Sequence, residues 1–548
     1  MEIVRKNLFR NLKGDIFGGL TAAVIALPLA LAFGVASGLG PAAGLYGAIA
    51  TGFFAAIFGG TPAQVSGPTG PMTVVMGAVV AAHAGTMPEA FAIVMLGGAF
   101  QILFGFAKVG HYVRYTPYSV VSGFMTGIGM IIIIIQTLPF LGLPAAEGGP
   151  VGAVRALLLI DPGAIGFNAP VLAILSLVTI ILWPQSLRRF VPSPLAALLV
   201  GTLAGVLLLK GVPTIGAIPG GLPNIHIPVF SFGDLGGMVQ AGLVLALLGS
   251  IDSLLTSLVA DSITRTAHDS NQELIGQGIG NMVAGLIGGL PGAGATMRTV
   301  INVRAGGRTP ISGAIHALVL LTLALGLGPL AAKIPLAVLA GILMKVGWDI
   351  IDWGYLKHVH MVPRDKAVVM IITFLMTVFV DLITAVAVGI ILAAFVNARA
   401  LSEEQLKGVH HHSGEGGEDI ALTQEERDLL RKGKGKVIVT RLRGAFSYAS
   451  ARELGRRVSQ QILGRLVDIY DFSEAGYIDP SAAMALDDLF KQAKSGNQTI
   501  MVVGLSGKAK KILEGFGVLD LVQSKHRFEN RREAILAALT LVAEESEA

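Results

Sequence analysis

The chain has 548 residues, of which 53% are hydrophobic and 14% are charged, whereas soluble globular proteins carry about 25% charged residues. This composition excludes an ordinary soluble protein over most of the length. The absence of cysteine excludes a disulfide framework, a thiolate metal site and a cysteine nucleophile. The formal net charge of +5 is explained by basic loops between apolar segments, so we expect no nucleic-acid partner.

The N-terminal segment, Met1 to Lys13, is basic and precedes a long apolar run. That run is too long for a signal peptide and lacks a small-residue cleavage site, so we expect an uncleaved first membrane span. A helix needs about 20 mostly apolar residues to cross the hydrocarbon, and about fourteen such stretches, some of them short, lie between Ile16 and Ala398. The sequence therefore predicts an all-α membrane domain over residues 1–400.

The basic loop residues indicate the orientation of these spans. Threading the chain from a cytoplasmic N-terminus places Lys108, Arg188, Arg265, Arg308 and Lys357 on one side, as the positive-inside rule requires. We therefore expect a multi-pass protein of a bacterial inner (plasma) membrane, with the lipid bilayer as its surroundings. The N-terminus and the C-terminal region are both expected in the cytoplasm.

Two apolar segments are interrupted by glycine and proline just before a short helix, around Pro68–Pro71 and around Pro291–Thr296. They are the third and tenth spans, and Thr69 and Thr296 lie 296 − 69 = 227 residues apart. Matched interrupted segments are typical of inverted-repeat transporters and of their binding sites. Helix N-termini that begin at such breaks present free N–H groups, so they favour an anion site. The alternative is that glycine and proline only allow close packing.

Asp252 is a carboxylate near the centre of the predicted eighth span, and Thr256 follows one turn later on the same helical face. A carboxylate beside an anion site indicates a cation between them, which suggests Na⁺ or H⁺ coupling. Asp252, Thr256, Thr296 and a carbonyl near Gly294 could supply oxygen ligands to sodium. The alternative is a structural pair between Asp252 and Arg298.

Arg298 falls in the first turn of the second interrupted helix. Its guanidinium could add positive charge to the anion site, or it could extend to the cytoplasmic face. Asp381, the other deep carboxylate, is expected to have a structural role at the membrane interface.

The last part of the chain has a different character. Residues 401–432 are predicted to be a linker, in which His410–His412 form a solvated run and not a metal site, because three adjacent side chains cannot all face one ion. Residues 433–548 alternate strand and helix patterns, which predicts a small α/β domain. This domain contains no nucleophile elbow, phosphate-binding loop or metal spacing. We expect binding or regulation from it, and no enzymatic activity from the chain.

Several motifs resemble one known family over nearly the whole length. They are "GDIFGGLTAAVIALPLALAFGVASGLGPAAGLYGA", "GPTGPMTVV", "DSLLTSLVADSITRTAHDSNQELIGQGIGN", "GAGATMRTVINVRAGGRTPISG" and "DIYDFSEAGYIDPSAA". They resemble the sulfate permease (SulP) family of anion transporters with a C-terminal STAS domain, and look most similar to its BicA-type sodium-dependent bicarbonate transporters. The resemblance implies fourteen spans in two inverted seven-helix repeats, divided into core and gate domains, and usually a homodimer.

The resemblance also implies roles for individual residues. It places sodium at Asp252, Thr256, Gly294 and Thr296, and bicarbonate near Thr69, Ala295 and Thr296. Gly70 and Arg298, at the two helix starts, complete the predicted substrate site. Arg298 stands where the BicA-type pattern has glycine and many other members have arginine, so sulfate or a dicarboxylate is an alternative substrate. In the STAS domain, Asp479 is followed by Pro480 and not by a phosphorylatable serine, which argues against a phospho-switch there.

Together these observations predict Na⁺-coupled bicarbonate uptake by an elevator-like movement of the core, with Na⁺ as coupling ion and no other cofactor. One alternative is a proton- or sodium-coupled symporter for sulfate or a dicarboxylate. Alternatives of another class are an anion channel and a membrane signalling scaffold that acts through the STAS domain, which could also contribute to assembly.

Overall fold

The computed structural model divides the chain into two compact units, Met1–Ala393 and Ala394–Ala548. It describes the chain from Asn11 to Glu547 apart from residues 83–86, 114–116, 147, 162, 164, 189–190, 217–222, 231–232, 381, 414–421 and 463. The basic residues that precede Asn11 therefore lie outside the described residues, and so does Asp381.

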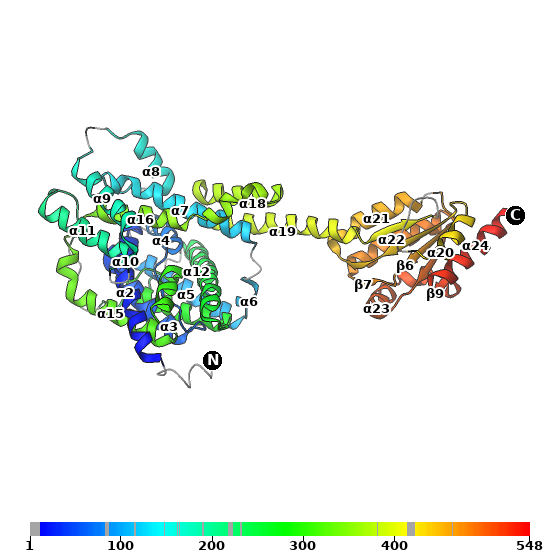
Figure 1. Cartoon of the computed structure of the whole chain (residues 1–548), viewed down its shortest axis with the longest axis horizontal. Helices are drawn as coiled ribbons and strands as arrows, with labels where there is room; N and C mark the ends of the chain where they lie inside the picture. Colours follow the sequence, from blue (N-terminus) through cyan, green and yellow to red (C-terminus); the bar gives the residue numbers. More distant parts are fainter. Residues whose placement is uncertain are drawn as a thin grey trace. The chain divides into compact units, whose positions relative to one another are not determined.

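The first unit is mainly helical in its described residues, as Figure 1 shows. Its main helices are α2 (Leu12–Ala36), α3 (Pro41–Phe58), α4 (Gly70–Ala82), α5 (Met87–Phe106), α7 (Tyr118–Phe140), α9 (Asn168–Leu182), α11 (Ser193–Leu207), α12 (Leu235–Thr264), α13 (Ser270–Leu286), α14 (Thr296–Arg304), α15 (Pro310–Ala331), α16 (Leu336–Ile350) and α18 (Arg364–Phe379). Helix α19 (Leu382–Leu406) begins in this unit and ends in the second. Further helices between them are α6 (Gly110–Val113), α8 (Gly149–Leu158), α10 (Gln185–Arg188) and α17 (Trp353–Lys357).

Within the described residues, six helices are long and apolar enough to cross a membrane: α2, α3, α5, α7, α12 and the part of α19 from Thr384. Shorter apolar helices of 10–17 residues accompany them, among them α4 and α11. The membrane domain is therefore all-α, as the sequence predicts. The total of about fourteen spans stays a prediction.

These helices form two bundles. In the first bundle, α2, α3, α5, α12, α13, α14 and α15 pack on one another, and in the second bundle α7, α9, α11, α16 and α18 do so. Close approach depends on small residues, as expected between helices in lipid. A Cβ added to Gly98 of α5 would lie 2.5 Å from the Gly278 carbonyl oxygen of α13, and the reverse distance is the same. The two bundles agree with the core and gate expected from the resemblance.

The second unit is an α/β domain built on a five-stranded sheet of order β3-β4-β6-β8-β9 (Figure 1). Strand β3 (Val409–His412) is antiparallel to β4 (Val437–Leu442), and β6 (Val467–Asp471), β8 (Thr499–Val503) and β9 (Arg527–Phe528) continue the sheet in parallel. A separate pair joins β5 (Gly444–Phe446) to β7 (Ala475–Ile478). The helices are α20 (Gln424–Lys432), α21 (Tyr448–Ile462), α22 (Pro480–Ser495), α23 (Gly507–Gly515) and α24 (Arg531–Glu547).

The described parts of the region predicted to be a linker, 401–432, include the end of α19, strand β3 and helix α20, all within the second unit. His410–His412 form the edge strand β3 and pair with Val439–Arg441 of β4, so they are not a solvated connector. The prediction failed because three consecutive histidines show no alternation of apolar and polar residues. By contrast, the start of α20 carries a recognisable sequence signal, since Thr423 and Glu426 form a capping box. Both side chains hydrogen-bond the backbone of the first turn.

A largely buried ion cluster joins α20 and α24 to the sheet of the second unit. Arg531 of α24 donates from Nε to Glu426 Oε1 at 2.8 Å and from Nη1 to Asp471 Oδ2 at 3.0 Å.

Removing one partner of a buried ion pair leaves charge uncompensated, so we expect Arg531→Met to lower the free energy of unfolding of this unit by about 3 kcal/mol. Urea denaturation followed by circular dichroism measures the loss. The control is Arg532→Met, whose pair with Glu425 is exposed and is worth less than about 1 kcal/mol; equal effects would contradict the prediction.

We expect Asp468 on β6 to make the stability of the second unit depend on pH. Its side chain is fully buried, and neither carboxylate oxygen has a hydrogen-bond partner. Burial raises the pKa of Asp468 from 3.8 to about 7, with Arg465 acting in the opposite direction. Because the pKa is higher in the folded state, the fold favours the neutral acid, and stability falls as pH rises from about 4 to 7. We expect a loss on the order of 4 kcal/mol over this window.

Urea denaturation between pH 4 and pH 8 tests this dependence. Asp468→Asn removes the titrating group while keeping its size, so the variant should show a flatter profile and higher stability than the wild type at pH 8. A wild-type unfolding free energy that rises from pH 4 to pH 7 would contradict the assignment.

Candidate functional site

The two interrupted segments cross each other inside the first unit. They form the short strands β1 (Ser66–Gly67) and β2 (Ala293–Gly294), which pair antiparallel with Ser66 opposite Gly294 and Gly67 opposite Ala293. The offset of 227 residues exchanges the two pairs, since 66 + 227 = 293 and 294 − 227 = 67, so the crossing has the symmetry of an inverted repeat. Helix α4 begins at Gly70, three residues after the end of β1, and α14 begins at Thr296, two residues after the end of β2. The crossing therefore brings two helix N-termini into one place.

The Thr256–Gly294–Thr296 group joins α12 to β2 and to the start of α14. Thr256 Oγ1 lies 3.0 Å from the Gly294 carbonyl oxygen and 2.7 Å from Thr296 Oγ1. The Gly294 amide in turn donates to Ser253 Oγ at 3.0 Å. Three of the residues predicted to bind sodium are thus in direct contact, and their oxygen atoms form a compact group.

Asp252 lies one turn before Thr256 on α12. It lines a small cavity with Pro71, Phe124 and Leu248, between the first bundle and α7 of the second. Its carboxylate lies close to the Thr69 hydroxyl and interacts electrostatically with Arg298. Neither Asp252 Oδ2 nor Thr69 Oγ1 makes a hydrogen bond of good geometry, although both atoms are buried. Such unpaired buried polar atoms are rare in proteins and call for a further partner.

Arg298 is 2% exposed, so its side chain does not extend to the membrane surface. Its Nη2 donates to the Pro68 carbonyl oxygen, and its Nη1 lies against Gly67 without a hydrogen-bond partner. Within the described residues there is no ion pair between Arg298 and Asp252 at the usual 4 Å limit. The guanidinium therefore contributes a buried positive charge that still has donors to offer.

The remaining predicted site residues lie at the two helix starts. Gly70 is the first residue of α4, where a Cβ would approach Ile350 Cδ1 to 2.7 Å and Ile132 Cδ1 to 3.0 Å, so it marks the contact with the second bundle. Ala295 precedes α14, and no side chain caps the amides of the first turn. Those amides remain available to an anion. The described hydrogen bonds include none between Asp252 and the Thr256–Gly294–Thr296 group.

A polar network behind the site was missed by the sequence reasoning. Glu273 of α13 is buried and accepts four hydrogen bonds: from the Gly60 and Thr61 amides at 2.9 Å each, from Gln64 Nε2 at 2.7 Å and from Gln277 Nε2 at 2.8 Å. Thr61 Oγ1 also meets Ser257 Oγ of α12 at 2.7 Å. The network fixes the chain that leads into β1. A carboxylate in an apolar region is itself a signal of importance, so Glu273 could have been found.

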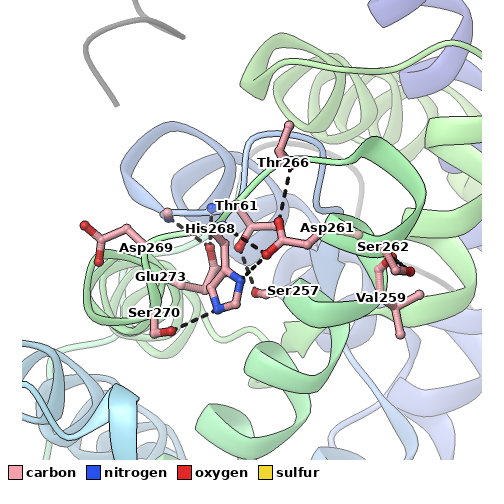
Figure 2. Close-up of polar contacts among 12 residues, drawn as sticks. Thr61, Ser257, Val259, Asp261, Ser262, Thr266, His268, Asp269, Ser270 and Glu273 are labelled. Atoms are coloured by element: carbon pink, nitrogen blue, oxygen red, sulfur yellow. Dashed lines mark hydrogen bonds and ion pairs between the residues drawn. The ribbon is translucent and has the colours of Figure 1, made fainter. Parts of the chain in front are cut away.

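The turn between α12 and α13 is held by a second polar group, shown in Figure 2. Asp261 Oδ2 lies 2.7 Å from His268 Nδ1, and His268 Nε2 lies 2.9 Å from Ser270 Oγ. The order of these contacts is that of a hydrolase triad, but the nearby Asn271 and Gln272 amides already donate to the Asp269 side chain. They cannot also stabilise an oxyanion. The group closes the turn and so holds the start of α13, which carries Glu273.

Comparisons with known proteins agree with this architecture. The profile of the sulfate permease family matches residues 12–373, and that of the STAS domain matches residues 429–534. The chain is 45% identical to the bicarbonate transporter BicA of Synechocystis sp., over 100% of this chain and 98% of that protein. It is 31% identical to the putative sulfate transporter YvdB of Bacillus subtilis, over 95% of this chain and 96% of that protein.

Solved structures give the same result. The transmembrane domain of a cyanobacterial bicarbonate transporter BicA is 52% identical and superposes with a TM-score of 0.66, over 69% of this chain and 98% of that chain. SLC26A9, at 19% identity, shares the fold with a TM-score of 0.78 over 98% of this chain and 92% of that chain. With its two helical bundles, its crossed strands and its C-terminal α/β unit, the chain belongs to the sulfate permease family of membrane transporters and carries a STAS domain.

Proposed function

We propose that this protein is a secondary active transporter that takes up bicarbonate together with Na⁺ across a bacterial inner membrane. The observation that carries the proposal is the meeting of Asp252, Thr69 and Arg298 beside the uncapped start of α14. Oppositely charged buried groups that are not paired with each other suit a site for a cation and an anion together. The close similarity to bicarbonate transporters supports the choice of substrate.

The anion is expected between the two helix starts. The free amides at Thr296 and the following residues, together with Arg298 Nη1, provide hydrogen-bond donors and positive charge. Thr69 Oγ1, which is also unpaired, adds a hydroxyl on the side of α4. Gly70 and Ala295 complete the walls with small residues that leave the backbone accessible.

The cation is expected beside the anion, at Asp252. Hard cations prefer oxygen ligands, and the Thr256 hydroxyl already lies within 3.0 Å of both the Gly294 carbonyl oxygen and the Thr296 hydroxyl. With the Asp252 carboxylate one turn away, these atoms fit the donor set of sodium. A bound cation would also offset the repulsion between this carboxylate and an incoming anion, which gives a physical basis for coupling.

The second candidate is a symporter for sulfate or a dicarboxylate, and the buried Arg298 favours it because a fixed positive charge suits a doubly charged anion. Uptake of radiolabelled bicarbonate into proteoliposomes, with and without a Na⁺ gradient and with sulfate or fumarate as competitor, separates the two. Bicarbonate accumulation that depends on Na⁺ supports the proposal. Proton-driven sulfate uptake supports the second candidate, and uptake that does not saturate would indicate a channel.

For movement of the substrate, we propose that the first bundle carries the site past the second bundle. The Asp252 cavity lies between the bundles, since α7 of the second bundle lines one side of it. A homodimer and a cytoplasmic STAS domain with a regulatory role complete the proposal.

A further inference from the structure

A second cavity, of about 410 Å³, lies in the first unit away from the Asp252 site. Leu31 of α2 and Leu45 of α3 line one side of it, and Leu198 and Leu203 of α11 line the other. Its volume falls in the range of about 300–1,000 Å³ typical of ligand pockets. The cavity therefore lies between α2, α3 and α15 of the first bundle and α11 of the second; Figure 1 labels α2, α11 and α15.

The walls are apolar with two exceptions, Thr202 and Lys333. Thr202 Oγ1 is buried and has no hydrogen-bond partner. Other threonines in the apolar helices donate to the carbonyl four residues earlier, as Thr179 does to Leu175 at 2.6 Å and Thr322 does to Leu318 at 2.9 Å. A hydroxyl left unpaired in an apolar environment is costly, so Thr202 indicates an acceptor supplied by a ligand.

The cavity is an open groove, and Lys333 lies at its mouth. It is exposed and precedes Ile334, whose carbonyl accepts from the Ile215 amide at 2.9 Å in the segment that follows α11. Lys333 and the C-terminal end of α11 therefore lie at the same end of the groove. Thr202 lies five residues before Leu207, where α11 ends, which is about 8 Å deeper.

The order of groups from the mouth inward is a cation, a hydrogen-bond donor and a long apolar surface. A phospholipid carries a phosphate, an ester carbonyl and an acyl chain in the same order. At the depth of α11 in the membrane, lipid is also the molecule that surrounds the protein. We propose that this groove binds one anionic phospholipid, with its phosphate at Lys333, an ester carbonyl at Thr202 and one acyl chain along the leucines between the two bundles.

The preference for an anionic lipid follows from Lys333. The head group of phosphatidylcholine carries its own cation, which would meet the ammonium group of Lys333, whereas phosphatidylglycerol has no such charge. One lysine near a membrane surface is worth about a fivefold preference for an anionic lipid. This preference can be measured without transport, so the test is independent of the proposed function.

Full-length protein is reconstituted in nanodiscs of equal parts phosphatidylglycerol and phosphatidylcholine, and retained lipid is then counted by native mass spectrometry. We expect one phosphatidylglycerol per chain. Lys333→Gln should lower the ratio of phosphatidylglycerol to phosphatidylcholine about fivefold, and Ala324→Phe, which fills the groove, should abolish retention. Thr202→Val, which keeps the size of the side chain, should weaken retention. Lys210→Gln, an exposed lysine that does not line the groove, serves as the control.

Equal retention of the two lipids by the wild type, or an unchanged ratio in Lys333→Gln, would overturn the proposal. So would full retention in Ala324→Phe. A changed oligomeric state of Ala324→Phe with unchanged lipid would show that the groove is a contact between two copies of the chain, and would also overturn it. If Ala324→Phe does not fold, Thr202→Val and Lys333→Gln decide the matter, since neither changes the packing volume greatly.

Discussion

Replacing Asp252 with asparagine is expected to abolish the Na⁺ stimulation of bicarbonate uptake while the protein still folds. The substitution keeps the shape of the side chain but removes the negative charge that a cation needs, next to hydroxyls that are neutral. If any stimulation remains, the apparent Na⁺ affinity should be at least about tenfold lower, equivalent to 1.4 kcal/mol. Initial rates of uptake into proteoliposomes, measured as a function of Na⁺ concentration, give this value directly.

For the anion, we expect the same variant to have the opposite effect, a gain in affinity. Without the carboxylate, Arg298 loses the negative charge with which it interacts, so the site becomes more positive. Anion binding without Na⁺ should therefore become tighter in Asp252→Asn, and calorimetric titration with bicarbonate in Na⁺-free buffer measures it. The matched control is Asp365→Asn, an exposed aspartate at the start of α18. Na⁺ stimulation equal to that of the wild type in Asp252→Asn would refute the cation assignment.

Replacing Arg298 with glycine is expected to change the choice of anion. The guanidinium is buried against Gly67 and Pro68, between the two helix starts, and supplies positive charge there. Its removal should raise the KM for bicarbonate and should weaken competition by sulfate more strongly, because a doubly charged anion gains more from a fixed positive charge. We expect at least about a tenfold loss in sulfate competition, which is the effect of 1.4 kcal/mol.

Arg298→Lys refines this test, because it keeps the charge but loses the planar group that can donate to Pro68 and to an anion at once. It should restore part of the sulfate competition. Arg304→Ala, an exposed arginine in the last turn of the same helix, is the control and should behave as the wild type. If Arg298→Gly retains the wild-type order of anions, the arginine has no part in substrate choice.

The meeting of the two interrupted segments could be predicted from the sequence, because glycine and proline interrupt both apolar segments in the same way at a fixed offset. The proximity of Asp252 to Thr69 follows from that pattern together with the rule that buried carboxylates face a polar interior. The pairing of Ser66 with Gly294 could not be predicted, because two-residue strands have no periodicity to detect.

Other features depend on contacts between distant parts of the chain. The hydrogen bond from Arg298 to Pro68 joins residues 230 positions apart, and Glu273 binds amides 212 and 213 positions away. Propensity and spacing describe neighbours along one helix, so they left open whether Arg298 faces the site or the membrane surface. The strand formed by His410–His412 was hidden for a similar reason, since its partner β4 determines it.

The ladder between Ser66–Gly67 and Ala293–Gly294 has a consequence for how this protein tolerates change. Each half of the molecule contributes one strand to this ladder, so a shift of one helix start would also displace the other. Substitutions on the two sides should therefore show strong epistasis, with combined effects that differ from the sum of the single ones. Among relatives, we therefore expect substitutions in these two strands to occur in pairs.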